Sequence, residues 1–337
     1  MCPLWNSPQL LKLPQKHQQS NLAKNTFKPP LSQRGEAFLF MNNALLIADS
    51  GSTKTDWIYV APDGTETELH TDGINPARDT RVYIYNVVRQ LLTETLSNSP
   101  LKGENNDSLP LREGWGGSIF FYGAGCIAPF SQTVQSVISE LLPGCSVQVE
   151  SDLLGAARAL CGHDPGIACI LGTGSNSCLY DGKDIVMHTP PLGYILGDEG
   201  SGSMLGKTLL NGLFKGLLPQ ELKQAFCDKY DMTLPDIIQH VYRQPAANTF
   251  LASLVPFIVE HRAHPAIHDM LISAFRLFFE RNITVYQHRE MPVNCVGGIA
   301  QQFTEEIREA AAAEDMQIGR ILRRPIESIV QYHLCER

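Results

Sequence analysis

The chain presents one order of predicted elements twice, about 120 residues apart. Residues 44–60 and residues 167–180 each read as an apolar strand, a turn of small residues and a second strand. An Asp-Gly turn then leads into a third strand, at 65–71 in the first copy and at 185–187 in the second. The residues of the two copies differ, so the repeat is one of structure, and it predicts two related α/β units.

Helices and further strands continue each unit. The first unit has predicted helices at 78–96, 131–142 and 153–160 and strands at 119–122 and 147–149. The second unit has a helical insert at about 203–288, strands at 293–296 and 318–322, a helix at 304–313 and a last helix from Pro325. Two apolar stripes in the insert, at 251–258 and 270–278, follow helical spacing and are interpreted as core faces.

The length and composition agree with two globular domains. The 337 residues are 43% hydrophobic and 18% charged, which is ordinary for folded domains of about 150 residues each. We predict an N-terminal domain at 44–164 and a C-terminal domain at 165–324 that contains the insert. The last helix, at about 325–337, is expected to pack back on the first domain.

The first forty residues have a different composition. Residues 1–40 hold five basic residues, one acidic residue and five prolines, without sustained hydrophobic periodicity. Such a segment does not build a core, so we expect a disordered or non-native extension before a natural start at Met41. An organelle transit peptide is the alternative interpretation, because the segment is basic and poor in acids.

The net charge of −8 and an isoelectric point near 5.7 limit the partners of the chain. A negative surface repels phosphate backbones and anionic lipids, so neither nucleic acid nor a membrane surface is expected. The longest stretch without charges, residues 114–139, is interrupted by glycines, serines and Pro129, and a membrane span is not predicted there.

The nine cysteines are odd in number and form no C-x-x-C pair. Several lie in apolar runs such as residues 167–171, where a free thiol behaves as a small buried hydrophobe. This usage indicates a reducing compartment and hence a cytoplasmic location.

The first small-residue turn has the composition of a phosphate-binding loop. Gly51 allows the backbone to approach an anion, and Ser52 and Thr53 offer hydroxyl and amide donors. Asp49, at the end of the strand, is a candidate for holding hydrated Mg²⁺. Lys54 is either a phosphate contact or a charged residue of an exposed hairpin.

Three further turns are rich in glycine. Residues 172–176 repeat the ingredients of the first turn in the second unit, and two such turns predict a nucleotide clamped between the units. Residues 193–203 place two carboxylates among glycines just before a helix, which suits the binding of hydroxyl groups. Gly297 and Gly298 follow a strand, where a flat base or an α-phosphate could lie on the backbone; a tight strand-to-helix turn is the other interpretation.

Five segments, in this order, resemble the N-acetylglucosamine kinase branch of the BadF/BadG/BcrA/BcrD-type ATPase family: residues 49–55, 151–156, 172–176, 197–201 and 297–298. That family belongs to the sugar kinase, actin and heat-shock-chaperone superfamily, and the resemblance covers about residues 44–333. It implies an α/β fold of two ribonuclease H-like, actin-like ATPase domains around a nucleotide cleft. It also implies ATP and Mg²⁺ as cofactors.

The resemblance implies a role for each matching position. Nucleotide and phosphate binding would fall to Asp49, Gly51, Ser52, Thr53, Lys54, Gly172, Thr173, Gly174, Ser175, Gly297 and Gly298. The sugar pocket would be formed by Asn75, Asp152, Thr173, Asn176, Gly193 and Asp198. Asp152 would be the general base that accepts the proton of the sugar hydroxyl. The residues alone favour a helix N-cap for Asp152, and the two roles can coexist.

The expected function is therefore ATP-dependent phosphorylation of an amino sugar hydroxyl, with a small-molecule amino sugar as the partner and a homodimer as a candidate assembly. Two alternatives stay open: an iron–sulfur activator-type ATPase, and a non-catalytic regulatory protein that binds sugar or nucleotide. Cys126 favours the activator. The stretch that resembles the activator's second cysteine motif, however, reads Ser151-Asp152 and has no cysteine to bind a cluster.

Overall fold

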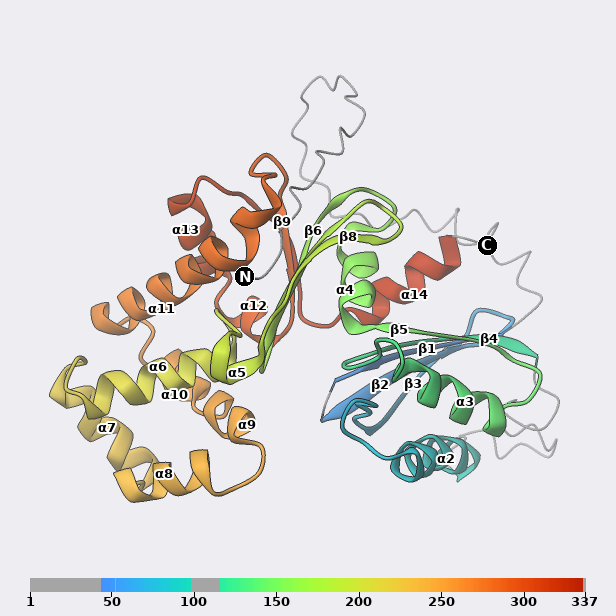
Figure 1. The fold of residues 1–337 in the computed structure, drawn as a ribbon, viewed down its shortest axis with the longest axis horizontal. Coiled ribbons are helices and arrows are strands. Elements are labelled where there is room, and N and C mark those ends of the chain that lie inside the picture. The colour runs from blue at the N-terminus through green and yellow to red at the C-terminus, as the bar shows by residue number, and fades with distance from the viewer. Residues whose placement is uncertain (1–43, 52, 98–115, 336–337) are drawn as a thin grey trace, which may run out of the picture.

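The computed structural model describes residues 44–51, 53–97 and 116–335 (Figure 1). The predicted extension at 1–40, Met41 and Ser52 lie outside the described residues. Figure 1 shows two lobes, each built on a twisted sheet, with the helices α4 and α14 between the sheets.

The first sheet is formed by five strands in the order β3-β2-β1-β4-β5. Its strands are β1 (Ala44–Ser50), β2 (Lys54–Val60), β3 (Glu66–Asp72), β4 (Gly117–Gly123) and β5 (Ser146–Ser151). The pairs β1–β2 and β2–β3 are antiparallel, whereas β1–β4 and β4–β5 are parallel.

The second sheet repeats this arrangement, with the order β10-β9-β6-β7-β8. Its strands are β6 (Gly166–Leu171), β7 (Ser175–Tyr180), β8 (Ile185–Thr189), β9 (Val293–Val296) and β10 (Ile318–Leu322). The first three strands are again antiparallel neighbours, and β6, β9 and β10 are parallel. The predicted structural repeat is confirmed, because both sheets have one strand order and one set of directions.

Helices cover the outer face of each sheet. On the first sheet, α2 (Arg81–Ser97) and α3 (Ser131–Leu141) bury apolar residues against β1 and β4. The second lobe holds the helices α5 (Gly193–Leu196), α6 (Gly202–Phe214), α7 (Gln220–Tyr230), α8 (Leu234–Tyr242), α9 (Ala247–Ala252), α10 (Val255–Glu260), α11 (Pro265–Phe278), η2 (Phe279–Ile283), η3 (Thr284–Tyr286), α12 (Gly298–Gln302) and α13 (Thr304–Ala313). Of these, η2, α12 and α13 contact strands of the second sheet, whereas α7 and α8 pack on α6 and α9, away from the sheet (Figure 1).

The two helices between the sheets are exchanged. Helix α4 (Asp152–Cys161) follows β5 of the first sheet, yet Leu153 and Ala157 pack against the second sheet. Helix α14 (Ile326–Cys335) follows β10 of the second sheet, yet Ile329 and Val330 pack against the first. Each lobe therefore buries apolar surface that the other lobe supplies, which couples their stability.

Two details differ from the simple helical pattern. The predicted helix at 78–96 begins at Arg81, because Asn75 and Asp79 close a turn before it, with the Asn75 amide donating to Asp79 Oδ2 at 2.7 Å. The apolar stripe at 251–258 is buried at Leu251 and Ile258, as predicted. The stripe is divided between α9 and α10. Pro256 lies at the start of α10, where its lack of an N–H to donate is tolerated.

The stripe at 270–278 is likewise part of the core. The cysteines of the described residues are free thiols, and four of them are buried. Among the described residues, no helix has both the length and the apolar composition for crossing a membrane.

Candidate functional site

The described site residues lie at one edge of each sheet. They lie at the end of β1, in the connections after β1, β3, β6, β8 and β9, or at the start of the next element, as Asp152 does after β5. Because these strands run in one direction within each sheet, their carboxyl ends meet at a common edge. In open α/β sheets, ligands bind outside these strand ends.

In the first lobe this edge brings two carboxylates together. Burial, followed by the neighbouring charges of Asp152 and Asp56, raises the pKa of Asp49 to about 7, while the charge of Lys54 acts in the opposite direction. Burial also raises the pKa of Asp152. A raised pKa is the mark of carboxylates whose negative charge is only partly compensated.

The start of helix α4 orients Asp152. Ser151 is the N-cap, and its Oγ accepts a hydrogen bond from the Leu154 amide at 3.2 Å. Asp152 is the first helical residue, and its Oδ1 accepts from the Leu153 amide at 2.9 Å. The N-cap prediction for Asp152 is therefore wrong by one residue, because the cap requires an extended backbone and Ser151 has it.

Cys126 lies in the loop after β4, near the charge of Asp152. Its side chain is buried, and burial, followed by the charge of Asp152, raises the pKa of the thiol to about 12. A thiol in this environment stays protonated and enclosed.

The first hairpin is open to solvent. Gly51, Thr53 and Lys54 are exposed, and the Gly51 amide donates to the Lys54 carbonyl at 3.0 Å. Lys54 Nζ lies 2.9 Å from Oδ1 of the buried Asp56, so its charge is held beside the hairpin. Sequence reasoning did not identify Asp56, because a single Asp within a strand gives no local signal of burial.

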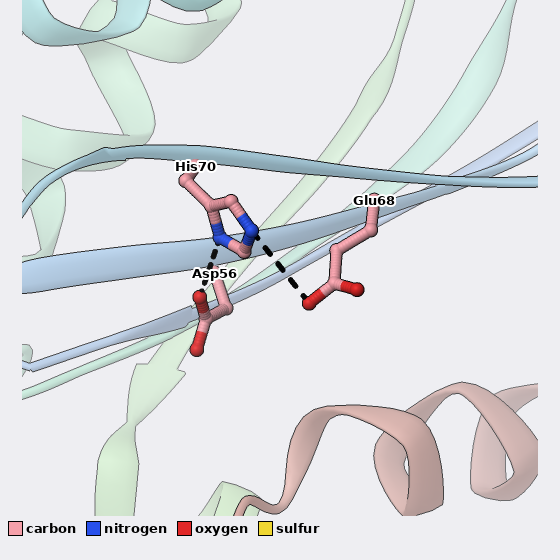
Figure 2. A group of neighbouring side chains, drawn as sticks. All are labelled: Asp56, Glu68 and His70. Atoms are coloured by element: carbon pink, nitrogen blue, oxygen red, sulfur yellow. Dashed lines mark hydrogen bonds and ion pairs between the residues drawn. The ribbon is translucent and has the colours of Figure 1, made fainter.

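Asp56 belongs to a row of charged side chains across β2 and β3 (Figure 2). His70 Nδ1 lies 2.7 Å from Asp56 Oδ1, and His70 Nε2 lies 3.8 Å from Glu68 Oε1. One ligand atom from each of these three residues falls within 4.8 Å of the others, as in a metal site. Lys54 and a second cation, Arg324, already neutralise the two carboxylates, so we interpret the group as an ion-pair network.

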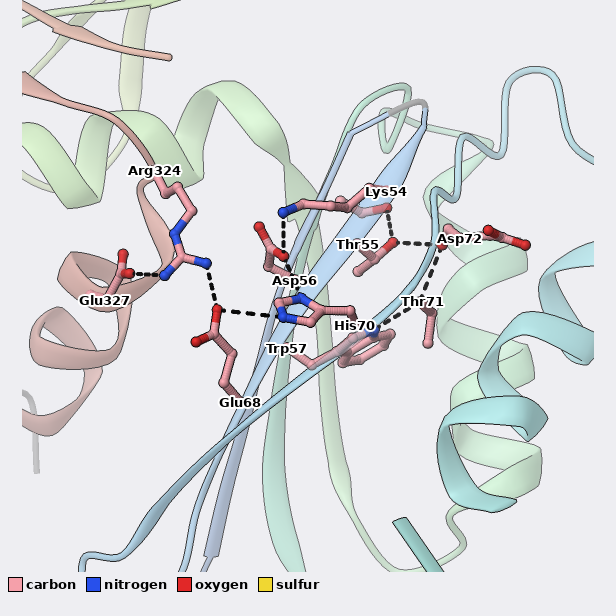
Figure 3. Close-up of polar contacts among 11 residues, drawn as sticks. Lys54, Thr55, Asp56, Trp57, Glu68, His70, Thr71, Asp72, Arg324 and Glu327 are labelled. Carbon is pink, nitrogen blue, oxygen red and sulfur yellow. Dashed lines mark hydrogen bonds and ion pairs between the residues drawn. The ribbon is translucent and has the colours of Figure 1, made fainter. Parts of the chain in front are cut away.

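Arg324 extends this ion-pair network to α14, the helix that follows the second sheet and packs on the first (Figure 3). Its guanidinium donates to Glu68 of β3 and to Glu327 of α14. The segment after β10 is thereby tied to the first sheet, close to the first hairpin.

Ser50 joins three loops of the first lobe, and sequence reasoning missed it. Its Oγ donates to the Ile74 carbonyl at 3.1 Å and accepts from the Ile74 amide at 3.0 Å, while its carbonyl accepts from the Ala124 amide at 2.9 Å. Asn75 follows Ile74, and its Oδ1 accepts a hydrogen bond from the Ala77 amide. A Cβ on Gly125 would lie 2.2 Å from that Oδ1, so the loop after β4 packs tightly on Asn75.

In the second lobe the equivalent turn is held by its own backbone and by the first residues of α6. The Gly172 amide donates to the Gly174 carbonyl at 2.9 Å. The Gly202 amide donates to the Gly172 carbonyl at 2.8 Å, and the Ser203 amide donates to the Thr173 carbonyl at 3.1 Å. The predicted second and third glycine-rich turns therefore form one unit.

Asp198 lies against this turn. A Cβ on Gly174 would be 3.1 Å from Asp198 Oδ2. Burial raises the pKa of Asp198 to about 6, and a hydrogen bond from the Ser175 amide opposes this shift. Its backbone is left-handed, with φ of 57°, which is strained for a residue other than glycine.

A cavity of about 630 Å³ opens beside the same turn. Glycines and Thr173 line part of it, and residues of α9, α10 and α12 line the rest; most of these are apolar, but Glu260 and Gln302 also contribute. Gly297 has φ of 127°, and a Cβ there would lie 2.2 Å from the Leu171 carbonyl oxygen, so only glycine fits. This size and lining suit a nucleoside.

The remaining predicted residues, Asn176 and Gly193, lie at the ends of these two turns. Asn176 Oδ1 accepts from the Ser177 amide and lies 2.8 Å from His188 Nε2, so it is engaged within the second sheet. Gly193 begins the short helix α5, with φ of 73°, and is exposed.

A scan against protein-family models and a search of curated proteins find no match. Among solved structures, the "Putative N-acetylglucosamine Kinase" from Porphyromonas gingivalis is 39% identical, with 86% of this chain and 99% of that chain covered and a TM-score of 0.78. A "Putative N-acetylglucosamine Kinase" from Chromobacterium violaceum is 19% identical, with 86% and 98% covered and a TM-score of 0.65, and shows the fold alone. On the first of these similarities, this chain belongs to the N-acetylglucosamine kinase-like branch of the BadF/BadG-type ATPase family, with a two-domain, actin-like α/β fold.

Proposed function

We propose that this protein transfers the γ-phosphate of ATP to a hydroxyl group of an amino sugar. One observation carries the proposal: the turns at 172–174 and 297–298 meet at a single cavity of about 630 Å³. A glycine-rich turn with free space beside it can bind phosphates through backbone amides, and the apolar lining can hold the adenine ring. The name of the 39% identical structure supports a sugar as the acceptor.

Asp152 is proposed as the general base. A sugar hydroxyl is a weak nucleophile near neutral pH, and a carboxylate with a raised pKa is better matched to accept its proton. The hydrogen bond from the Leu153 amide holds this side chain at the start of α4. Asp198 and Asn75 are proposed to orient the sugar by hydrogen bonds to its hydroxyls.

The first lobe is proposed to balance the negative charge of the phosphates. Asp49 fits a Mg²⁺ ion held through water, because its carboxylate is buried beside Asp152 and its pKa is raised. Bound Mg²⁺ supplies the positive charge that offsets the phosphates during transfer. Gly51, Thr53 and Lys54 form the exposed hairpin that faces this edge, with Lys54 held by Asp56.

The experiment is ADP release from MgATP with N-acetylglucosamine, glucosamine, N-acetylmuramic acid and glucose, comparing the parent with Asp152→Asn. The asparagine keeps an acceptor for the Leu153 amide, and we expect turnover to fall about a thousandfold. Asp269→Asn, at an exposed position of α11, is the matched control and should match the parent.

Two results would contradict the proposal. No sugar stimulates ADP release, or Asp152→Asn turns over like the parent. Binding of MgATP and sugar without ADP release would favour the regulatory alternative. The activator alternative is disfavoured by the enclosed thiol of Cys126.

A further inference from the structure

The proposed function uses Asp198 but not its neighbour Glu199, whose side chain is 10% exposed. A carboxylate with so little access to water is costly unless it is paired and hydrogen-bonded. The hydrogen-bond partners of Glu199 therefore show which element fixes the turn at 197–200, which contains Asp198.

Both partners come from one short π-helix, η2. Arg281 Nη1 donates to Glu199 Oε1 at 3.0 Å, and Asn282 Nδ2 donates to Glu199 Oε2 at 3.4 Å. Successive residues of an α-helix point about 100° apart. The wider π-turn lets these two adjacent side chains reach one carboxylate, and such turns are frequent at functional sites.

The π-helix is itself fixed to the second sheet. The Asn282 carbonyl accepts from Ser177 Oγ of β7 at 3.3 Å and from Thr189 Oγ1 of β8 at 3.1 Å. The hydroxyl of Tyr286 lies 2.7 Å from Ser177 Oγ and accepts from the Thr189 amide at 3.2 Å. Glu199 is thus anchored, through η2, to two strands of the sheet.

The turn at 197–200 has little freedom of its own. A Cβ on Gly197 would lie 2.0 Å from the Pro191 carbonyl oxygen, and one on Gly200 would lie 3.0 Å from Phe278 Cβ. The left-handed backbone of Asp198 is strained and persists only where its surroundings impose it. Within this turn, Glu199 is the residue whose side chain is hydrogen-bonded to the π-helix η2.

We propose that Glu199, held by Arg281 and Asn282, is a positioning residue: it fixes the strained turn so that Asp198 stays against Gly174. The amides of Gly202 and Ser203 bind the turn at 172–174, so the sugar-binding carboxylate and the phosphate-binding turn keep one relative position. This inference rests on the proposed function. Misplacing a positioning group by about 1 Å can cost as much as a hundredfold in rate.

The test compares Arg281→Met with Arg276→Met. Both arginines are more than half exposed and pair with a shielded glutamate, at 3.0 Å to Glu199 and at 2.9 Å to Glu314. Only the first pair touches the turn. We expect Arg281→Met to raise the KM for N-acetylglucosamine about tenfold, with the KM for MgATP within about twofold of the parent. Arg281→Lys, which keeps the charge, should recover part of the loss.

Hydrogen exchange supplies a readout that does not require turnover. The amides of Asp198, Gly202 and Ser203 donate to the Pro191, Gly172 and Thr173 carbonyls, so they are protected while the turn is fixed. We expect exchange at Asp198 to accelerate at least several-fold in Arg281→Met and not in Arg276→Met. Equal exchange in the two variants would overturn the inference, as would an unchanged KM for the sugar in Arg281→Met. A parent that phosphorylates no sugar would instead contradict the proposed function, and the exchange result would still decide the role of Glu199.

Discussion

The turn after β1 and the turn after β6 occupy the same place in two sheets of one topology, yet they are built differently. In the first, the Gly51 amide bonds to Lys54 and the side chains face solvent. In the second, the backbone of Gly172 and Thr173 is bound by the first residues of α6. Strand order therefore sets where a turn lies, and the elements packed on it set how rigid it is.

The two edges also differ in chemistry. The first lobe contributes carboxylates with raised pKa values, Asp49 and Asp152, and an ion-pair network. The second lobe contributes glycine turns around a cavity, with Asp198 packed against one of them. In a phosphoryl-transfer enzyme, this division separates the groups that handle charge and protons from those that bind the nucleotide.

The largest expected effect comes from adding a methyl group in the second lobe. Gly297→Ala places a Cβ 2.2 Å from the Leu171 carbonyl, at φ of 127°, and should lower the free energy of unfolding by about 3 kcal/mol. Gly298→Ala is the matched control, because a Cβ there meets nothing within 4 Å. Denaturant unfolding measures both. Equal losses in the two variants would mean that the turn is looser than described.

The second prediction concerns pH and the first lobe. Asp49 ionises near pH 7 in the folded protein and near its ordinary value, 3.8, when unfolded. Its contribution to stability is therefore complete below about pH 4 and is lost as the pH rises through 7. As the pH rises from 5 to 8 without added Mg²⁺, the parent should lose roughly 2 kcal/mol of stability that Asp49→Asn keeps.

Asp198→Asn is the matched variant of the second lobe. Its carboxyl group has a pKa of about 6, so the window is narrower and the relative gain should be smaller. Denaturant unfolding at the two pH values measures both variants. The comparison between the lobes fails if Asp198→Asn gains more than Asp49→Asn.

A third prediction compares the two turns directly. Gly174→Ala brings a Cβ within 3.1 Å of Asp198 Oδ2 and should cost about 1 kcal/mol of stability. Gly51→Ala meets its nearest atom at 3.6 Å, an ordinary contact, and should change stability by less than about 0.5 kcal/mol. Thermal unfolding distinguishes them, and a larger loss from Gly51→Ala would reverse the assignment of the rigid turn.

The smallest effect is expected at the network that joins the lobes. Arg324→Met removes the ion pairs to Glu68 and Glu327, which are partly exposed, so the loss should be at most about 1 kcal/mol. It should shrink in 1 M NaCl, where exposed charges are screened. Arg81→Met, which removes an exposed pair with Glu140, is the control. A loss that persists in high salt would indicate packing by Arg324 instead of charge.

Much of the fold is predictable from local patterns. Apolar runs bounded by small-residue turns predict β1, β2, β6 and β7, and the Asp-Gly turns predict the strands that follow. The boundaries fail where side chains compete with the helix pattern, as at Asn75 and Asp79 before α2. Likewise, Ser151 takes the cap that the sequence suggests for Asp152, because the capping oxygen must come from the last extended residue.

Local signals in the sequence were thus sufficient for the doubled α/β architecture and for the glycine turns, because strand periodicity and backbone freedom act over a few residues. The folded arrangement was needed for the packing of α4 on the second sheet, for the proximity of Asp49 and Asp152, and for the contacts of Ser50, Asp56 and Glu199. Burial, pKa shifts and hydrogen bonds depend on contacts between distant segments, as when η2 holds a carboxylate from the turn before α6. A sequence shows which groups the chain carries, whereas their environment exists only once the two lobes have packed together.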